Sequence, residues 1–377
     1  MGNNLSRNMA TKKSLNILFL ADHRSIHDKK WITWISENTN HNCYLISRSV
    51  HGEMKETWNK VKFLGNIPDY SVTQPWKNKH GKRFLKGIID TNRIDLFHVY
   101  YLEPNALWTL YVHDIGVLTG FTSRGSDVLI GLNHFLERRD ILANLLVRRY
   151  RKSLQKGEFI FSTSGAQKER IDRYFLGKNE VEIVRTGVNI EKLVDLRKKG
   201  LPKKRQVLFG RNMQPIYNHH FVLDQLGNLP SHVKEEYEFI FVDSDSTNVE
   251  YTDFIREKIA DLTDLKINFL TSQKGNDYHK LIAESTVNVM TPLSDGAPVS
   301  AIETLCLNTN LVLPDLPYDA DLFSKALYYE HHSGDDFIDT LMVALNSTTE
   351  TDNSYLELVD RNTQMQIVAS IYDEIGK

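Results

Sequence analysis

Short apolar runs rich in β-branched and aromatic residues recur along the chain, and stretches with the apolar spacing of helices separate them. A parallel sheet wrapped by helices gives this pattern, because its strands are buried on both faces and crossover helices connect them. The pattern predicts two series of strands, the first at 15–21, 43–47, 94–99, 117–121, 159–162 and 181–184, and the second at 207–210, 238–242, 267–270, 287–290, 311–313 and 326–329.

Two series of strands predict an α/β protein with two Rossmann-like domains. The length of 377 residues agrees with this, because one hydrophobic core rarely serves so long a chain. A basic stretch with Gly200 and Pro202 is typical of a linker, and helical spacing returns near the C-terminus. We therefore expect a first domain over 1–190, a linker over 191–205, a second domain over 206–354 and a helical segment over 355–377.

Charge and cysteine content indicate which binding partners and which cellular compartment to expect for this protein. Lys and Arg number 46 against 48 Asp and Glu, so the net charge gives no reason to expect a nucleic acid as partner. Cys43 and Cys306 lie far apart, each in an apolar run, which favours core thiols in a reducing compartment. Neither a signal peptide nor a transmembrane segment is recognisable, and we expect a cytoplasmic protein.

The segment 291–305 carries the clearest functional pattern. Its sequence predicts a strand that ends near Thr291, a loop with Asp295 and Gly296, and a helix that starts near Pro298. Glycine lets the backbone approach a ligand closely, and proline is well tolerated in a first helical turn. The unpaired N–H groups and the dipole of a helix N-terminus favour an anion, so this segment predicts a diphosphate site.

Two carboxylates bracket this predicted site. Seven residues separate Asp295 from Glu303, a spacing that suits the two ends of a nucleotide sugar. Carboxylates bind the hydroxyl groups of a sugar or ribose strongly, because an ionised acceptor strengthens the hydrogen bond. An ordinary strand–loop–helix junction, with Asp295 in a turn and Glu303 solvated on the helix, explains the same residues equally well when they are taken alone.

The segment SDGAPVSAIETLCLNTNLVLPD resembles the E-x7-E segment of retaining GT-B glycosyltransferases, those of family four. In this resemblance Asp295 replaces the first Glu and Glu303 is the second. The resemblance implies two Rossmann-like domains facing across a cleft, with a C-terminal helix that crosses back to the first domain. It also implies that Asp295 lies against the donor sugar and that Glu303 binds ribose. The backbone that would hold sugar and phosphates is that of Gly296, Ala297, Pro298, Val299 and Ser300.

The stretch VLFGRNMQPIYNHH is similar to the start of the second domain in that family, where an Arg and a Lys bind the donor diphosphate. Arg211 matches the Arg, and Tyr217 and Asn218 occupy the neighbourhood of the Lys. The resemblance therefore implies a catalytic set of Asp295, Arg211 and Glu303. The simpler alternative for Arg211 is a surface salt bridge.

In the first domain, LTGFTSRGSDVLIG resembles the glycine-containing loop that faces the cleft, which implies donor contacts from Arg124 and Gly125. IDLFHVYYLEPNA resembles the strand end with a D-x-x-H pattern, and DHRSIHDKKW resembles the loop that shapes the acceptor side. The simpler interpretation of the first of these two stretches is a core histidine, and that of the second is solvated loop residues. The candidates for the acceptor side are His27, Lys30, His98 and Asp127.

The resemblance implies transfer of a sugar from a nucleoside diphosphate sugar to an acceptor hydroxyl with retention, and no cofactor. The acceptor would be a carbohydrate, a lipid-linked molecule or a small metabolite, in polysaccharide or glycolipid biosynthesis. No G-x-G-x-x-G or Walker loop is present, and the histidines lack metal-site spacing, so we expect no metal. A sugar-nucleotide epimerase and a non-catalytic partner subunit remain as alternatives.

The segment 135–156, FLERRDILANLLVRRYRKSLQK, is predicted to form a basic amphipathic helix. Such a helix can lie on anionic lipid and make the protein a peripheral membrane protein. Packing inside its own domain is the more usual role of such a helix.

Overall fold

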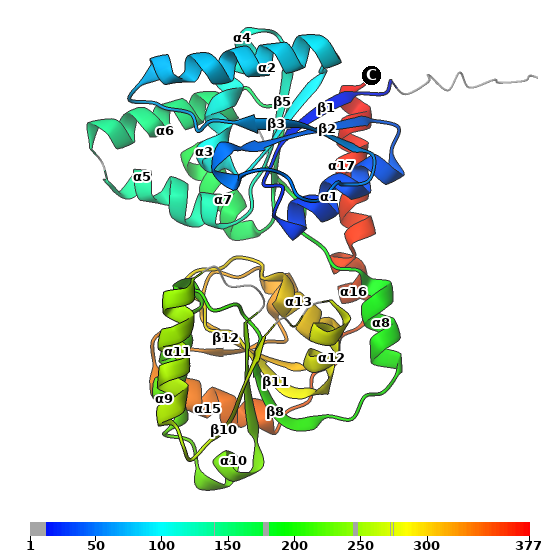
Figure 1. Ribbon diagram of the computed structural model, residues 1–377. Coiled ribbons are helices and arrows are strands. Elements are labelled where there is room, and N and C mark those ends of the chain that lie inside the picture. The colour runs from blue at the N-terminus through cyan, green and yellow to red at the C-terminus, as the bar shows by residue number, and fades with distance from the viewer. Residues whose placement is uncertain (1–12, 139, 176–180, 244–247, 272, 274) are drawn as a thin grey trace, which may run out of the picture. The chain divides into compact units, whose positions relative to one another are not determined.

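The computed structural model describes residues 13–138, 140–175, 181–243, 248–271, 273 and 275–377. Within it the chain divides into two compact units (Figure 1). The first unit comprises the chain up to Ser162 together with 168–184 and 365–377, and the second comprises 163–167 and 185–364. Each unit is built on its own parallel sheet, so the two predicted series of strands form two separate sheets.

The sheet of the first unit has seven parallel strands in the order β3-β2-β1-β4-β5-β6-β7. Its strands are apolar on both faces, as alternating side chains of β1 demonstrate. Leu18 and Leu20 contribute to one core, and Ile17 and Phe19 contribute to the core on the opposite face. The strands are β1 (Asn16–Leu20), β2 (Asn42–Arg48), β3 (Val61–Ile67), β4 (Leu96–Tyr100), β5 (Leu118–Thr122), β6 (Phe159–Ser162) and β7 (Glu182–Ile183).

Helices cover both faces of this sheet (Figure 1). Buried side chains of α2, α4 and α6 pack on the face of Leu18, and those of α1 and α17 pack on the face of Phe19. The helices are α1 (Ile26–Asn38), α2 (Asn78–Asn92), α3 (Leu102–Asn105), α4 (Thr109–Asp114), α5 (Asn133–Arg138), α6 (Ile141–Leu154), α7 (Gly165–Tyr174) and α17 (Arg361–Ile375).

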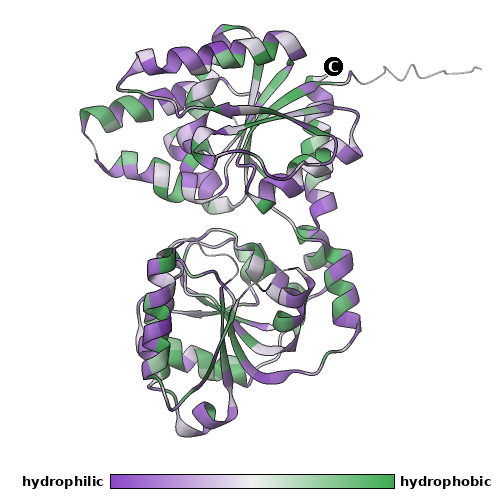
Figure 2. Cartoon of the chain, viewed as in Figure 1, coloured by the Kyte–Doolittle hydropathy of each residue, from purple (hydrophilic) through white to green (hydrophobic). Residues whose placement is uncertain are grey.

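The second unit has six parallel strands in the order β10-β9-β8-β11-β12-β13. Figure 2 shows apolar strands inside each unit and polar residues on the outer sides of the helices. The strands are β8 (Lys204–Phe209), β9 (Glu238–Asp243), β10 (Lys266–Thr271), β11 (Ser285–Val289), β12 (Asn310–Pro314) and β13 (Leu327–Tyr329). The helices are α8 (Ile190–Lys198), α9 (His219–Leu226), α10 (Ser231–Glu236), α11 (Val249–Asp261), α12 (Asn276–Glu284), α13 (Val299–Cys306), α14 (Ala320–Phe323), α15 (Gly334–Leu345) and α16 (Asn353–Val359).

The C-terminal segment returns to the first unit, as the fold prediction required. Met365, Val368 and Tyr372 follow one another at helical spacing on α17 and are fully buried in the core on the α1 face. The segment forms two helices instead of the single one expected. Asp360 has extended backbone angles between α16 and α17, and its carboxylate accepts a hydrogen bond from the Thr363 amide at 3.1 Å. An N-cap of this kind starts a new helix.

Among the strands of the described residues, the sequence pattern missed one, β3. It lies at the edge of the first sheet, and of its seven residues only Ile67 is fully buried. Apolar periodicity is weak in such a strand.

The segment 191–205, expected to be a linker, is largely structured in the second unit. Most of α8 falls within it, the Leu193 side chain is buried, and β8 begins at Lys204.

The prediction of one helix over 135–156 is wrong. The segment contains α5 and α6, and Arg139 between them lies outside the described residues. Asp140 caps α6, because its Oδ1 accepts a hydrogen bond from the Ala143 amide at 2.8 Å. None of the helices in the described part of the chain is long and apolar enough to cross a membrane.

Both cysteines are free and buried, one in each unit. Burial raises the pKa of the Cys43 thiol and that of the Cys306 thiol to about 12. Both side chains are therefore neutral at physiological pH, as expected of core thiols.

Candidate active site

The predicted strand–loop–helix unit forms at the carboxyl end of β11 in the second unit. Pro298 has extended backbone angles and directly precedes α13, which starts at Val299. No side chain caps α13 among the described residues, and within its first turn the Ala301 amide donates to the Pro298 carbonyl at 3.1 Å. Ala301, Ile302 and Leu305 anchor the helix in the core. This N-terminus is suited to an anion.

The Arg211 side chain reaches the start of α13 from the loop after β8. Its Nη1 donates to Ser300 Oγ at 2.9 Å, and its Nη2 donates to Asp295 Oδ2 at 3.2 Å. The guanidinium lies over the ring of Tyr217, 4.1 Å from the ring centroid. Residues that are far apart in the sequence thus hold the guanidinium next to the predicted anion site.

Asp295 and Arg211 form an ion pair that is mostly shielded from solvent, with side-chain exposures of 19% and 16%. Burial raises the pKa of Asp295, although the charge of Arg211 opposes the shift. For Arg211, burial lowers the pKa, but Tyr217 and Asp295 outweigh it and the net shift is upward. The other oxygen of Asp295, Oδ1, accepts a hydrogen bond from the Gly296 amide at 2.8 Å.

Glu303 lies further along α13, and a side chain that the sequence analysis missed holds it. His279 on α12 places its Nε2 3.1 Å from Glu303 Oε1. The next residue back, Tyr278, donates from its hydroxyl to the Gly210 carbonyl at 2.8 Å. Neither contact has a local sequence signal, because the two residues are 24 positions apart in the first contact and 68 in the second.

Gly296 is needed for packing as well as for access to a ligand. A Cβ atom at this position would lie 2.7 Å from Ser164 Oγ, closer than real contacts allow. Ser164 belongs to the short segment 163–167 of the second unit.

Arg124, which the resemblance assigned to the donor, is buried in the first unit. Its Nε donates to Asp28 Oδ1 at 2.9 Å, and the two side chains are 4% and 0% exposed. The guanidinium carbon lies 4.4 Å from the centroid of the Trp31 ring and 4.7 Å from that of the Tyr100 ring, and these two rings meet edge to face. Burial raises the pKa of Asp28 to about 6, with Arg124 opposing the shift.

Two other candidates of the first unit also have structural partners. The buried carboxylate of Asp127 accepts hydrogen bonds from the amides of Leu102, Arg124 and Gly125 at 2.7, 3.0 and 2.8 Å. It therefore fixes the loop that contains Gly125.

His98 is fully buried, with Nδ1 2.6 Å from Tyr372 Oη and Nε2 2.8 Å from Thr122 Oγ1. This geometry matches the simpler interpretation, a core histidine. Burial lowers the pKa of His98 well below its usual value. His27 and Lys30 lie in the first turns of α1 and are partly exposed.

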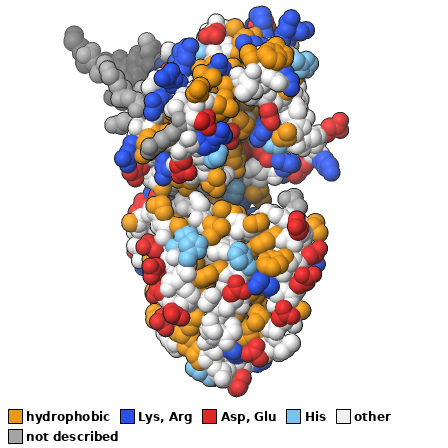
Figure 3. Space-filling view, turned by 90° about the vertical axis from the view of Figure 1, so that its left-hand side faces the viewer, with side chains coloured by type: hydrophobic (Ala, Val, Ile, Leu, Met, Phe, Trp, Pro, Cys, Tyr) orange, Lys and Arg blue, Asp and Glu red, His pale blue; other side chains and the backbone are white. Residues whose placement is uncertain are grey.

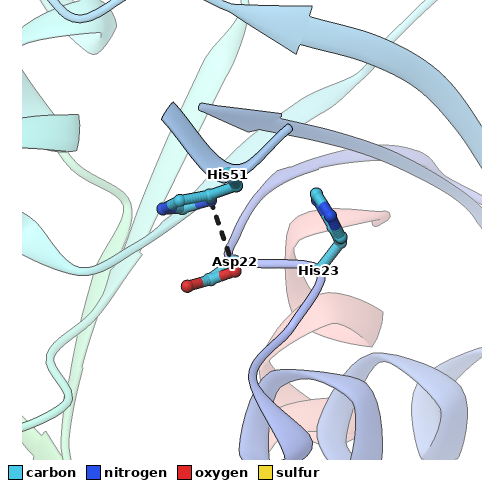
Figure 4. Close-up of side chains that lie close together, drawn as sticks. All are labelled: Asp22, His23 and His51. Carbon is cyan, nitrogen blue, oxygen red and sulfur yellow. Dashed lines mark ion pairs between the residues drawn. The ribbon is translucent and has the colours of Figure 1, made fainter. Parts of the chain in front are cut away.

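A second group of ionisable residues gathers at the carboxyl ends of β1 and β2. Asp22 and His23 follow β1, and His51 follows β2 (Figure 4). His51 Nδ1 lies 3.3 Å from Asp22 Oδ1 and 2.8 Å from Ser47 Oγ. Burial raises the pKa of Asp22, but hydrogen bonds from Arg24 outweigh it and the net shift is downward. Burial lowers the pKa of both histidines.

The sequence matches no family model and no curated protein. Solved structures are similar over nearly the whole chain. A glycosyltransferase from Rickettsia africae is 16% identical, with a TM-score of 0.73 and coverage of 97% of this chain and 99% of that one. A UDP-forming α,α-trehalose-phosphate synthase from Burkholderia xenovorans is 13% identical, with a TM-score of 0.71 and the same two coverages. Anabaena HepE in complex with UDP is 12% identical, with a TM-score of 0.68 and coverages of 96% and 100%. The chain therefore has the two-sheet α/β fold of GT-B glycosyltransferases.

Proposed function

We propose that this chain is a cytoplasmic glycosyltransferase that moves a sugar from a nucleoside diphosphate sugar to an acceptor hydroxyl, with retention and without a metal ion. The observation that carries the proposal is the guanidinium of Arg211 at the start of α13, in contact with Ser300 and Asp295. A fixed guanidinium and a helix N-terminus together favour a diphosphate. HepE was solved with UDP and with UDP-glucose, so uridine donors are the first to test.

The second unit supplies the donor contacts in this proposal. Arg211 and the first-turn amides of α13 stabilise the departing diphosphate, and this electrostatic stabilisation is the main catalytic effect. Asp295 and the backbone of 296–300 position the sugar. Glu303 binds the ribose hydroxyls through Oε2, because His279 already contacts Oε1.

The ion pair between Arg211 and Asp295 gives donor binding a defined first step. A diphosphate carries more negative charge than one carboxylate and accepts hydrogen bonds from both guanidinium nitrogens. It therefore replaces Asp295 as the partner of Arg211 Nη2. The released carboxylate is then free to accept hydrogen bonds from the sugar.

We assign the acceptor to the first unit. Ligands of open α/β sheets bind outside the carboxyl ends of the strands, and the loop after β1 carries His27 and Lys30 in the adjoining turns of α1. The acceptor is a carbohydrate, a lipid-linked molecule or a small metabolite, and the pathway is polysaccharide or glycolipid synthesis.

Thermal unfolding with a panel of UDP, GDP, ADP and their sugars tests the donor site. A ligand at about a hundredfold over its Kd adds about 2.7 kcal/mol to the free energy of unfolding. We expect one diphosphate to stabilise the protein and the variants Arg211→Ala and Glu303→Ala to lose this effect. Arg205→Ala is the matched control, because Arg205 is an exposed arginine of the same unit that pairs with Glu236. Stabilisation that survives both site substitutions would refute the assignment.

A non-catalytic partner subunit is the second candidate. Tyr217 and Asn218 stand where the resemblance implies a lysine, and Arg211 is already paired with Asp295. If no nucleotide stabilises the protein, this candidate replaces the first. Interconversion of nucleotide sugars without any acceptor would instead identify an epimerase.

Contact with a membrane surface is a separate part of the proposal. One outward line of α6 carries Ile141, Leu145, Arg148 and Lys152, all exposed and spaced by three or four residues. Figure 3 faces this side of the first unit and shows basic, acidic and apolar side chains mixed there. Exposed apolar side chains next to basic ones are typical of helices that lie on anionic lipid.

We expect the protein to co-sediment with phosphatidylserine-containing vesicles and much less with phosphatidylcholine vesicles. Arg148→Ala/Lys152→Ala should reduce binding to anionic vesicles about 30-fold, because each basic residue near the surface contributes about 1 kcal/mol. Lys86→Ala, an exposed lysine on α2, is the control. Equal binding to both vesicle types, or no effect of the double substitution, would refute the contact.

A further inference from the structure

Three potential metal ligands of the first unit come from two loops that end neighbouring strands. β1 and β2 pair in parallel, with Leu20 opposite Ile46, so the residues that follow them meet at one edge of the sheet. Asp22, His23 and His51 each offer one ligand atom, and these three atoms lie within 4.8 Å of one another. Figure 4 shows the His51 ring beside the Asp22 carboxylate and the His23 ring standing next to them.

The types of the three side chains suit a first-row dication. Two imidazoles and one carboxylate form a common ligand set for Zn²⁺ and are also accepted by Co²⁺ and Ni²⁺. Two ligands at about 2.1 Å from a tetrahedral ion lie about 3.4 Å apart. The separation of Asp22 Oδ1 from His51 Nδ1 is 3.3 Å, so these two atoms already have the spacing of ligands to one ion.

The third ligand, His23, has a nitrogen without a partner. Its Nδ1 is shielded from solvent and has no hydrogen-bond partner among the described residues. A buried polar atom without a partner is costly, and coordination of an ion would remove that cost. The loop already brings the ligand atom of His23 within 4.8 Å of those of Asp22 and His51.

Two groups now occupy the lone pairs that an ion would use. Arg24 Nε and Nη2 each lie 3.0 Å from an oxygen of Asp22, and the Ser47 hydroxyl contacts His51 Nδ1. The Arg24 side chain is 57% exposed, and an ion pair of this kind contributes little to stability. Arg24 is therefore a competitor that an ion can displace, and its removal should strengthen metal binding.

We propose that Asp22, His23 and His51 form a binding site for one first-row transition-metal dication of the Zn²⁺ class. The site lies in the first unit and uses none of the donor-site residues of the second unit. Three protein ligands leave a fourth position open for water or another oxygen ligand. The proposal does not depend on the glycosyltransferase proposal, which needs no metal.

Titration of the metal-free full-length protein with Co²⁺ tests the site. We expect one equivalent of Co²⁺ to give visible absorption bands of a four- or five-coordinate ion, and Zn²⁺ to remove them. His51→Ala and His23→Ala should weaken binding about tenfold or more, because direct ligands matter at least as much as the residues that orient them. Arg24→Gln should tighten binding, a result that a nonspecific surface site would not give.

The stacked pair His331 and His332, with ring centroids 3.8 Å apart, provides the control. Its double alanine variant should bind Co²⁺ like the unsubstituted protein. Circular dichroism of each variant separates loss of ligands from loss of fold. The proposal is overturned if Co²⁺ gives no such bands, if the histidine substitutions at positions 23 and 51 leave binding unchanged in folded protein, or if the control variant abolishes it.

Discussion

Arg211→Ala is expected to lower kcat/KM for sugar transfer by about 100- to 1000-fold. This is the loss that follows removal of one fixed hydrogen-bond donor to the charge that develops in the transition state. The effect is large because Arg211 is the residue that the structure holds between Ser300 and Asp295 at the start of α13. The value of kcat/KM is measured from the release of the nucleoside diphosphate. The assay uses the donor that gives the largest thermal shift and a panel of acceptors.

Arg211→Lys separates charge from geometry. An ammonium keeps the positive charge but lacks the planar fork with which the guanidinium binds a diphosphate, so we expect an intermediate loss. Arg205→Ala should leave the rate unchanged, because Arg205 pairs with Glu236 away from α13. A rate within a few-fold of the unsubstituted protein for Arg211→Ala would mean that this guanidinium does not act on the leaving group.

The strands could be predicted from the sequence wherever they are buried on both faces. Central strands such as β1 and β12 consist almost wholly of buried apolar residues, and continuous apolar runs mark them. The edge strand β3 is half-exposed and carries no such run. Two helix breaks were missed although each has a local signal. Asp140 and Asp360 are capping residues directly before helical residues.

The pattern of residues alone predicted the candidate site only where its residues are close in sequence, and Arg211 was added through the resemblance. The loop and first turn of α13 lie within one segment, and the sequence pattern located them. The contact between His279 and Glu303 depends on the packing of α12 against α13, and that between Asp22 and His51 depends on the pairing of β1 with β2. Such contacts across a sheet leave no spacing signal in the chain.

The burial of the Arg124 side chain could not be predicted from its local motif. Its position before Gly125 matches a loop that implies ligand contact, but its surroundings are set by α1 and β4. Those elements place the rings of Trp31 and Tyr100 in contact with the guanidinium and Asp28 at its Nε. A local motif predicts the backbone conformation of the loop. The burial of the side chain depends on residues elsewhere in the fold.

Arg124→Met is expected to lower the free energy of unfolding of the first unit by about 3–5 kcal/mol, because it leaves the buried carboxylate of Asp28 without its partner. All five tryptophans lie between positions 31 and 108, so tryptophan fluorescence during urea unfolding reports on the first unit. The double variant Asp28→Asn/Arg124→Met removes both charges and should recover most of the loss. Lys86→Met, which breaks an exposed pair with Asp90, should change stability by less than about 1 kcal/mol.

The pH dependence of stability checks the same pair independently. The pKa of Asp28 is about 6 in the folded protein against an ordinary value of 3.8, so the folded state holds the proton to higher pH. The free energy of unfolding should therefore fall as pH rises from about 4 to about 6, by about 3 kcal/mol. Asp28→Asn should remove this part of the pH dependence. If Arg124→Met unfolds at the same urea concentration as the unsubstituted protein, the pair contributes nothing to the stability of the first unit, and the burial of Arg124 must have another reason.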